Sequence, residues 1–351
     1  MRFGLNARGL LPTLLASSVA AAWPLTTPSG HPTRAHHVAS RVSMACEYAI
    51  DAYGPDAGTL PSILDAALDE VDRIDRLMSH YKSASPLSRV NREAAAHPVA
   101  VDAELFDFIA EAMRYQQESG GAFDITVGPL MKAWGFFAGE GRLPSGQALA
   151  AARRLVGGSH VTLNPTLRTI AFDTPGIELD LGGIAKGYAV DRVVAILKER
   201  QVTSALISAG GSTIYALGAP PGRRGWDVSI QDPIDARAIA LTLELKERAV
   251  SVAGRSEKFF VADGVTYSHI MDPRTGAPAQ GILSVVVLSR TGTEGDALDD
   301  AFFVLGPKAS REYLRRLPET DALFFLPDQQ RGWILVDTRD RGPAASGGDR
   351  R

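Results

Sequence analysis

Residues Ile177–Asp191 read IELDLGGIAKGYAVD, and the fold is best approached from this segment. Apolar residues alternate over 177–181, which predicts a β-strand, and they return at helical spacing after Gly182-Gly183. A strand, a glycine turn and a helix together present backbone N–H groups and the positive end of a helix dipole, which suit a phosphate group. Lys186 adds a positive charge beside the glycines. The spacing matches neither G-x-G-x-x-G nor G-x-x-x-x-G-K-[ST], so an ordinary tight turn is the alternative interpretation.

The composition is that of a soluble globular protein without an excess of basic residues. Of 351 residues, 45% are hydrophobic and 22% are charged, and the formal net charge is −3. This balance gives no electrostatic attraction for nucleic acid, so no nucleic-acid partner is expected. The single cysteine, Cys46, excludes an internal disulfide and a multi-cysteine metal site. No histidine pair stands at metal-ligand spacing, so a zinc site is not expected.

The N-terminus resembles an export signal. Arg2 and Arg8 precede the apolar run Leu10–Val19, and three alanines before Trp23 resemble a small-residue cleavage site. We therefore expect a periplasmic or otherwise exported protein of the cell envelope. A cytoplasmic protein with a disordered leader is the alternative.

The chain divides into four regions by composition. Residues 1–22 are the expected signal peptide, and residues 23–41, rich in Pro, Ser, Thr and His, are expected to be a linker. One folded domain is expected over 42–340, followed by a disordered tail at 341–351.

Helical patterns dominate the first half of this domain and strand patterns the second. Helices are predicted near 62–78, 102–119 and 145–156, and again at 296–305 and 307–317. Strands are predicted around 44–50 and at 205–208, 226–230, 239–245, 250–253, 266–271, 283–288, 323–326 and 333–336. Because helices and strands are grouped rather than strictly alternating, we predict an α+β fold of antiparallel sheets with packed helices.

A histidine at the end of a predicted strand is the second chemical feature. The segment Tyr267–Gly276 reads YSHIMDPRTG, in which His269 ends the strand and the DPRTG sequence favours a turn. A histidine with a pKa near neutrality can carry a proton during catalysis. A hydrogen-bonded structural histidine is the alternative.

Three carboxylates in one predicted helix are the third feature. Asp296 and Asp300 are four residues apart and share a face, and Asp299 lies beside them. Acidic residues in a first helical turn are expected from the helix dipole alone, but like charges at this spacing repel and so indicate a cation. Oxygen ligands favour Mg²⁺ or Ca²⁺. A phosphate-binding turn, a hard cation and a histidine together suit chemistry on a pyrophosphate.

In these motifs the sequence resembles the ApbE-type FAD:protein FMN transferases, or flavin transferases. The resemblance runs from about Met44 to Leu326, and the motifs occur in the family's order. They are Met44 in its strand, MSHYKSASPLSRVN (78–91), 121–130 followed by Trp134-Gly135-Phe136, DLGGIAKGYAVD (180–191), SAGGS (208–212), HIMDPRTG (269–276) and 296–306.

The resemblance implies an α+β flavin transferase that binds FAD, uses Mg²⁺ and transfers FMN to a Ser or Thr hydroxyl of a partner protein, releasing AMP. It implies that the FAD site is lined by Met44, Tyr81, Phe123, Asp124, Gly182, Lys186 and Ile270. It further implies that the carbonyl of Ala185 and the carboxylate of Asp296 hold the metal, and that His269 assists deprotonation of the attacking hydroxyl.

The chain departs from the family pattern at Asp299-Asp300, where Ala-Thr or Ser-Thr is usual. Asp300 therefore stands at a metal-site position with an added negative charge. The acceptor pattern of the family is Asp-Gly-x-Ser/Thr-Gly-Ala-Ser/Thr. The chain does not carry it at 263–268, so a separate acceptor protein is expected.

Two other functions are compatible with the same residues. Mg²⁺-dependent hydrolysis of FAD to FMN and AMP would use the same metal and the same glycine turn. A non-catalytic flavin-binding protein of the envelope is the second alternative, although binding alone would not require Asp180, Asp296 and His269 together.

Overall fold

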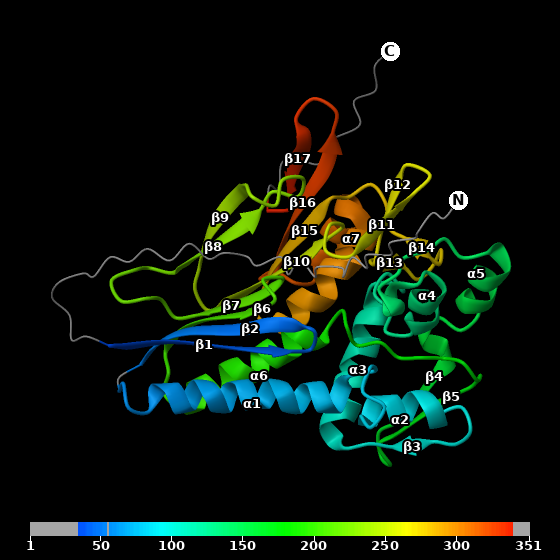
Figure 1. Cartoon of the computed structure of the whole chain (residues 1–351), viewed down its shortest axis with the longest axis horizontal. Helices are drawn as coiled ribbons and strands as arrows, with labels where there is room; N and C mark the ends of the chain where they lie inside the picture. The colour runs from blue at the N-terminus through cyan, green and yellow to red at the C-terminus, as the bar shows by residue number, and fades with distance from the viewer. Residues whose placement is uncertain (1–33, 55, 340–351) are drawn as a thin grey trace, which may run out of the picture.

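A computed structural model describes residues 34–54 and 56–339. Its centre is an eight-stranded antiparallel sheet with the order β1-β2-β6-β7-β10-β15-β16-β17 (Figure 1). The strands are β1 Ala35–Ser43, β2 Cys46–Gly54, β6 Ser204–Ala209, β7 Thr213–Leu217, β10 Arg248–Gly254, β15 Ser284–Ser289, β16 Asp321–Asp328 and β17 Gly332–Asp337. The inner strands β7, β10 and β15 are buried along most of their length because layers of apolar side chains cover the sheet.

Three long helices pack against this sheet. They are α1 Leu60–Met78, α6 Ala185–Glu199 and α7 Gly292–Leu314. In Figure 1, α1 and α6 run side by side below β1 and β2, and α7 lies against β10 and β15. The backbone of α7 breaks at Gly306 (φ 75°, ψ 172°), which confirms the prediction of two successive helices around this glycine.

Shorter helices form a group beside the C-terminal end of α1 (Figure 1). They are α2 Pro86–Glu93, α3 Ala103–Glu118, α4 Gly128–Ala133 and α5 Gly146–Arg153, with 3₁₀ turns at Phe136–Ala138 and Gly158–His160. A three-stranded sheet accompanies them, with the order β3 Val99–Ala100, β5 Thr169–Phe172 and β4 Val161–Asn164. Asp102 and Ser145 cap α3 and α5 by accepting backbone N–H bonds from Leu105 and Ala148.

Three small hairpins complete the fold. They are β8 Trp226–Gln231 with β9 Ile239–Leu245, β11 Phe259–Ala262 with β12 Val265–Ser268, and β13 Met271–Asp272 with β14 Ala277–Pro278. The predicted strand 266–271 is thus interrupted, and His269 lies directly after β12. The predicted α+β class with antiparallel sheets is confirmed. No helix of the described ranges is both long enough and apolar enough to cross a membrane.

The expected linker at 23–41 is wrong from Ala35 onward. Residues from Ala35 onward form the edge strand β1, which pairs with β2 over its full length. His36 Nε2 lies 2.6 Å from Asp51 Oδ1, and Arg41 contacts Asp72 of α1 at 3.2 Å. The strand escaped prediction because an edge strand has polar side chains on its exposed face and so lacks an apolar run. The expected signal peptide and C-terminal tail lie outside the described residues.

The predicted strand at 177–181 is also absent, although its apolar residues are buried as expected. This segment pairs with a side chain instead of a strand: Leu179 N donates to Asn91 Oδ1 (2.8 Å), and Asn91 Nδ2 donates to Leu179 O (2.9 Å). Asp180 N donates to Ile125 O (2.7 Å). An asparagine amide can replace a neighbouring strand because it offers one donor and one acceptor, and periodicity alone cannot reveal this.

Candidate functional site

Lys186 and Asp296 occupy the centre of the candidate site, where α6, α7 and the β6–β7 turn meet. Lys186 Nζ donates to Ser212 Oγ (2.7 Å) and lies 4.0 Å from Asp296 Oδ1. The buried Asp296 carboxylate accepts bonds from Gly187 N (3.0 Å) and Thr213 Oγ1 (3.0 Å). Burial alone lowers the pKa of Lys186, but the nearby carboxylates, above all Asp296, outweigh it and raise that pKa. Lys186 therefore keeps its positive charge at neutral pH.

A close contact between α6 and α7 holds this centre together. A Cβ on Gly187 would lie 2.1 Å from the carbonyl oxygen of Gly292, so the helices approach at a point where a larger residue cannot fit. Asp191 then accepts bonds from the N–H groups of Gly292 (2.6 Å) and Thr293 (2.8 Å), which begin α7. The KGYAVD part of the central segment thus positions the carboxylates of α7.

The three carboxylates of α7 point in different directions. Asp299 accepts a bond from Ser251 Oγ of β10 (2.7 Å), whereas a Cβ on Gly183 would lie 2.7 Å from Asp300 Oδ2. Burial and the two neighbouring carboxylates raise the pKa of Asp299 well above its ordinary value. Burial and Asp296 raise the pKa of Asp300 to about 7. Asp299 and Asp300 therefore bind protons more readily than ordinary carboxyl groups, because Lys186 alone does not offset the repulsion among three ionised carboxylates.

This crowding of carboxyl groups fits a hard cation, which would favour their ionised form in place of protons. Within residues 34–54 and 56–339, no three His, Cys, Asp or Glu side chains gather in a metal-binding group. The predicted metal set does not need such a group, because it combines two carboxylates, Asp296 and Asp300, with the carbonyl oxygen of Ala185 at the start of α6. Asp300 lies beside Gly183 and Asp296 beside Gly187 in the first turn of α6, so both flank Ala185, and oxygen donors are those that Mg²⁺ prefers.

The glycine turn before α6 is organised by Asp180. Its Oδ1 accepts the N–H of Gly182 (2.8 Å) and lies 3.3 Å from Nδ1 of His80. Burial raises the pKa of Asp180, but the hydrogen bond and charge of His80 outweigh it, so the pKa lies below its ordinary value. The Gly182 N–H is thus engaged within the chain, and an anion at this turn would be held chiefly by Lys186 and the helix dipole.

An aromatic group stands beside this turn. The ring of Tyr81 is 64% exposed and lies 3.8 Å, centroid to centroid, from the ring of His80. Phe137 stacks on His80 at 4.6 Å. Tyr81 was predicted from the resemblance, whereas His80 and Phe137 were not singled out. A flat aromatic ligand could stack here.

The remaining predicted FAD residues surround the centre less directly. The ring of Phe123 lies near Gly183, since a Cβ there would come within 3.4 Å of Phe123 Cε2. Asp124 is buried, and its Oδ1 accepts bonds from the N–H (2.8 Å) and hydroxyl (2.6 Å) of Thr126, so this oxygen is engaged within its own loop. Ile270 is buried next to His269.

Met44 does not lie in a strand as predicted. It forms, with Ala45, the two-residue turn between β1 and β2, and both residues have positive φ (50° and 59°). Two-residue hairpins of this kind require positive φ, which non-glycine residues adopt rarely. Tyr48 donates its hydroxyl to Met44 Sδ (3.2 Å), which fixes the methionine above the sheet end.

His269 is a neutral base rather than a histidine near its ordinary pKa. Burial, Lys258 and Lys186 lower the pKa of His269 to about 4. Its backbone N–H donates to Lys258 O (2.9 Å), its Nδ1 lies 3.3 Å from the same oxygen, and its Nε2 lies 4.0 Å from Glu257 Oε2. The expectation of a near-neutral pKa is therefore wrong, because neither burial nor the two lysines could be inferred from the local sequence.

Several residues of this centre escaped the sequence analysis. Ser212, Thr213 and Ser251 bind the charged groups, and Glu257 and Lys258 face them from the β10–β11 loop. Hydroxyl residues in strands and charged residues in loops are too common to indicate a site. SAGGS, in which Ser212 is the last residue, was the one local signal.

Cys46 lies at the edge of the same centre. A Cβ on Gly210 would come within 2.9 Å of its Cβ, so the start of β2 touches the β6–β7 turn. Burial raises the pKa of the Cys46 thiol to about 11, although Lys186 acts against it. The thiol is therefore protonated and unreactive at neutral pH.

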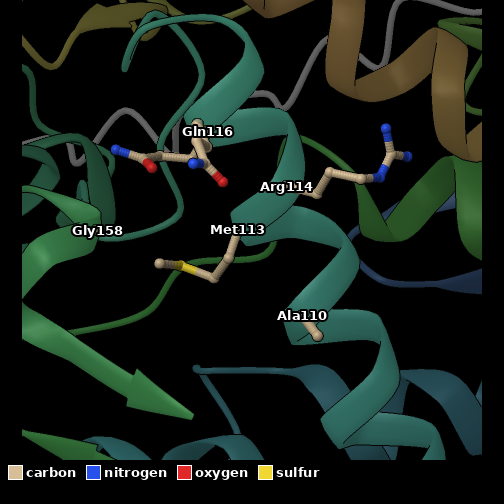
Figure 2. A pocket seen from close by; sticks show the side chains of 6 residues that line it. Ala110, Met113, Arg114, Gln116 and Gly158 are labelled. Carbon is tan, nitrogen blue, oxygen red and sulfur yellow. The ribbon is translucent and has the colours of Figure 1, made fainter.

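A separate hollow of about 340 Å³ lies along α3 (Figure 2). It is lined by Ala110, Met113, Arg114, Gln116 and Gln117 of α3 and by Gly158 of the 3₁₀ turn Gly158–His160. In Figure 2, the side chains of Met113 and Gln116 extend toward the side of Gly158, whereas that of Arg114 extends away from it. None of the predicted site residues lines it, although Gln116 Nε2 donates to Asp124 Oδ2 (3.4 Å). The hollow is thus a neighbour of the candidate site and not the site itself.

The fold and this centre define an α+β protein with a lysine, a carboxylate cluster and a neutral histidine placed around one glycine turn. Comparison with known proteins identifies the family. The model of the ApbE family matches residues 44–324, and the chain belongs to that family. The resemblance seen in the motifs is thereby confirmed.

Relatives and solved structures agree with this assignment. The chain is 35% identical over 284 residues to an FAD:protein FMN transferase of Treponema pallidum (strain Nichols), covering 76% of this chain and 78% of the relative. It is 30% identical over 269 residues to an FAD:protein FMN transferase of Escherichia coli (strain K12), covering 75% and 76%. The flavin transferase ApbE of Vibrio cholerae superposes with a TM-score of 0.78 at 28% identity, covering 87% of this chain and 97% of that one. The ApbE protein of Thermotoga maritima gives 0.77 at 29% identity, covering 86% and 96%.

Proposed function

We propose that this chain is an FAD:protein FMN transferase, which moves FMN from FAD to a Ser or Thr hydroxyl of an acceptor protein and releases AMP. The observation that carries the proposal is the position of His269, a neutral base, near Lys186, which itself lies 4.0 Å from Asp296 of α7. Relatives named for this reaction cover three quarters of the chain.

The reaction requires a hydroxyl oxygen to attack the FMN phosphorus of the pyrophosphate. A new P–O bond forms to the acceptor, the P–O bond to the bridging oxygen breaks, and AMP leaves with the electron pair. Nε2 of His269 takes the hydroxyl proton, which it can do because the ring is neutral. Lys186 attracts the phosphoryl oxygens by its positive charge, as lysines in phosphate-binding sites do.

A magnesium ion fits the donor set of this site. We propose that the Ala185 carbonyl, Asp296 and Asp300 hold it, and that when bound it neutralises charge on the phosphoryl oxygens. We propose that FAD lies against the residues named from the resemblance, Met44, Tyr81, Phe123, Asp124, Gly182, Lys186 and Ile270. Tyr81 is exposed enough to stack on a ring, and the positive charge of Lys186 would attract the phosphates.

An acceptor with the pattern Asp-Gly-x-Ser/Thr-Gly-Ala-Ser/Thr tests the proposal. The purified protein is incubated with FAD, Mg²⁺ and such a domain, and the intact mass of the acceptor is recorded. We expect a mass gain of one FMN, lost when the metal is chelated or when the acceptor hydroxyl residue is replaced by alanine. Free FMN and AMP without a modified acceptor would favour the hydrolase, and unchanged FAD would favour a binding protein.

A further inference from the structure

Lys258 lies directly opposite His269 and has no role in the function proposed above. The β11–β12 register pairs Phe259 with Ser268, and the next step pairs Lys258 with His269. The ladder continues there, because His269 N donates to Lys258 O (2.9 Å). Residues opposite each other in an antiparallel pair project from the same face, so both side chains leave the hairpin on one side.

The carbonyl oxygen of Lys258 determines which ring nitrogen of His269 carries the proton. Nδ1 lies 3.3 Å from this oxygen, which can only accept a hydrogen bond, so Nδ1 is the protonated nitrogen of the neutral ring. Nε2 then bears the free lone pair. Its distance of 4.0 Å to Glu257 Oε2 exceeds that of a hydrogen bond, so the lone pair is left for a substrate proton.

The charge of Lys258 acts on the same group. It lowers the pKa of His269, and it also lowers the pKa of Asp180 and of Cys46, which belong to two other parts of the site. Lys258 is exposed, yet its charge acts on all three of these groups. The other charges facing His269 are Lys186 from α6, which lowers its pKa, Asp180 from the glycine turn, which raises it, and Glu257 from the loop before β11.

We propose that Lys258 is a positioning residue for the transfer reaction, which fixes the His269 tautomer through its carbonyl oxygen and, through its charge, extends to lower pH the range in which Nε2 is free of a proton. This inference rests on the proposed function for its catalytic meaning, but both of its physical parts can be measured without any transfer. The tautomer depends on the backbone carbonyl, which any residue at this position would supply. Only the charge effect depends on the Lys258 side chain.

Three variants of the full chain separate these parts. Lys258→Met removes the charge, Lys258→Arg keeps it, and Lys246→Met removes an exposed lysine from the turn between β9 and β10 as a control. The histidine rings are labelled with ¹⁵N, and His269 is assigned by its loss in His269→Asn. In parent and variants alike, Nδ1 should be the protonated nitrogen at neutral pH. On acidification, the His269 titration of Lys258→Met should move to higher pH by about half a unit to one unit, while the other two follow the parent.

The transfer reaction offers a second readout. The acid limb of its pH profile should move upward in Lys258→Met by the same shift and stay in place in Lys258→Arg and Lys246→Met. If the parent shows no transfer, the proposed function fails, yet the titration still decides the role of Lys258. A proton on Nε2 in the neutral parent would overturn the tautomer assignment. Identical His269 titrations in the parent and Lys258→Met would overturn the charge effect. If Lys258→Met does not fold, Lys258→Gln serves in its place.

Discussion

At the scale of single residues, the protonation state of His269 follows from burial beside two lysines and not from its identity as a histidine. A protonated imidazole could not accept a hydroxyl proton, so the lowered pKa makes the residue competent as a base over the whole neutral range. The same ring would be unsuited to act as an acid at neutral pH. The direction of proton transfer is thus set by the surroundings of the ring.

His269→Ala should therefore bind FAD as the parent does and lose about 10²–10⁴-fold in transfer rate. The ring is removed while Lys186 and the carboxylates of α7 stay in place. FAD affinity is measured by flavin fluorescence and transfer by acceptor mass. If His269→Ala transferred FMN at the parental rate, His269 would be a hydrogen-bonded structural histidine and not the base.

The same lowered pKa predicts a pH dependence of stability. The folded chain binds the His269 proton near pH 4, whereas an unfolded histidine binds it near 6.5. Between these values the unfolded state holds more protons, so this residue destabilises the fold as pH falls through that window. Denaturant unfolding at pH 7 and pH 5 should show a smaller loss of unfolding free energy in His269→Gln than in the parent. An equal loss in both would contradict the assignment.

Asp300 offers a test of the metal proposal. Asp300→Asn removes the charge and keeps the shape, and Asp300→Thr leaves a single hydroxyl oxygen. Mg²⁺ affinity should fall in both, because ligand charge tunes such sites. The Mg²⁺ affinity is measured by calorimetry on the FAD complex, and the Mg²⁺ dependence of the transfer rate is measured in parallel. Glu294→Gln, on the first turn of the same helix, serves as the control for a general effect of helix charge. If Asp300→Asn bound Mg²⁺ with the affinity of the parent, Asp300 would not be a ligand of the metal.

At the scale of secondary-structure elements, the contact of α6 with α7 is the constraint on which the site depends. Gly187→Ala would place a Cβ 2.1 Å from a backbone oxygen of α7, and backbone cannot yield as a flexible side chain can. We expect a loss of about 1–3 kcal/mol of unfolding free energy, as overpacking typically costs, together with weaker FAD binding. Gly146→Ala, at the start of α5 with nothing within 4 Å, should be neutral or slightly stabilising. Equal stability of Gly187→Ala and the parent would show that the helices can separate freely.

The elements that sequence patterns predicted well are those with a regular apolar period. Helix α6, strand β9 and the two halves of α7 fall close to their predicted positions, because each buries one face or stripe. The prediction failed at 177–181, where the apolar residues are buried but the backbone pairs with a side chain instead of a strand. It also failed at β1, which has too few apolar residues to be recognised as a strand. A periodic apolar pattern indicates which residues are buried. It does not indicate whether the backbone of those residues pairs with a strand or with a side chain.

At the scale of the whole molecule, the site draws its residues from segments that lie far apart in the chain. His80 meets Asp180, and Thr213 meets Asp296, although each pair is separated by more than eighty positions. The glycine turn, Lys186 and the acidic helix could be proposed from local motifs. Their mutual contacts, and those of Lys258 and Ser251, arise only when the central sheet brings its strands together.

The N-terminal leader stays a prediction at this scale. We expect export and cleavage before Trp23, so that the mature chain starts ahead of β1. N-terminal sequencing of protein from the native host measures this directly. An intact Met1 on the cytoplasmic protein would contradict it.

The half-buried thiol of Cys46 has a practical consequence for experiments on this enzyme. With a pKa of about 11, roughly one thiol in 10⁴ is ionised at pH 7, and thiolate is the form that maleimides attack. Because the chain has no other cysteine, the unaltered protein should stay almost unlabelled. A cysteine introduced at exposed Val261 on β11, Val261→Cys, could then carry a fluorescent dye while Cys46 remains in place. Movements of the hairpin that bears His269 could thereby be followed in the native background as FAD and acceptor arrive.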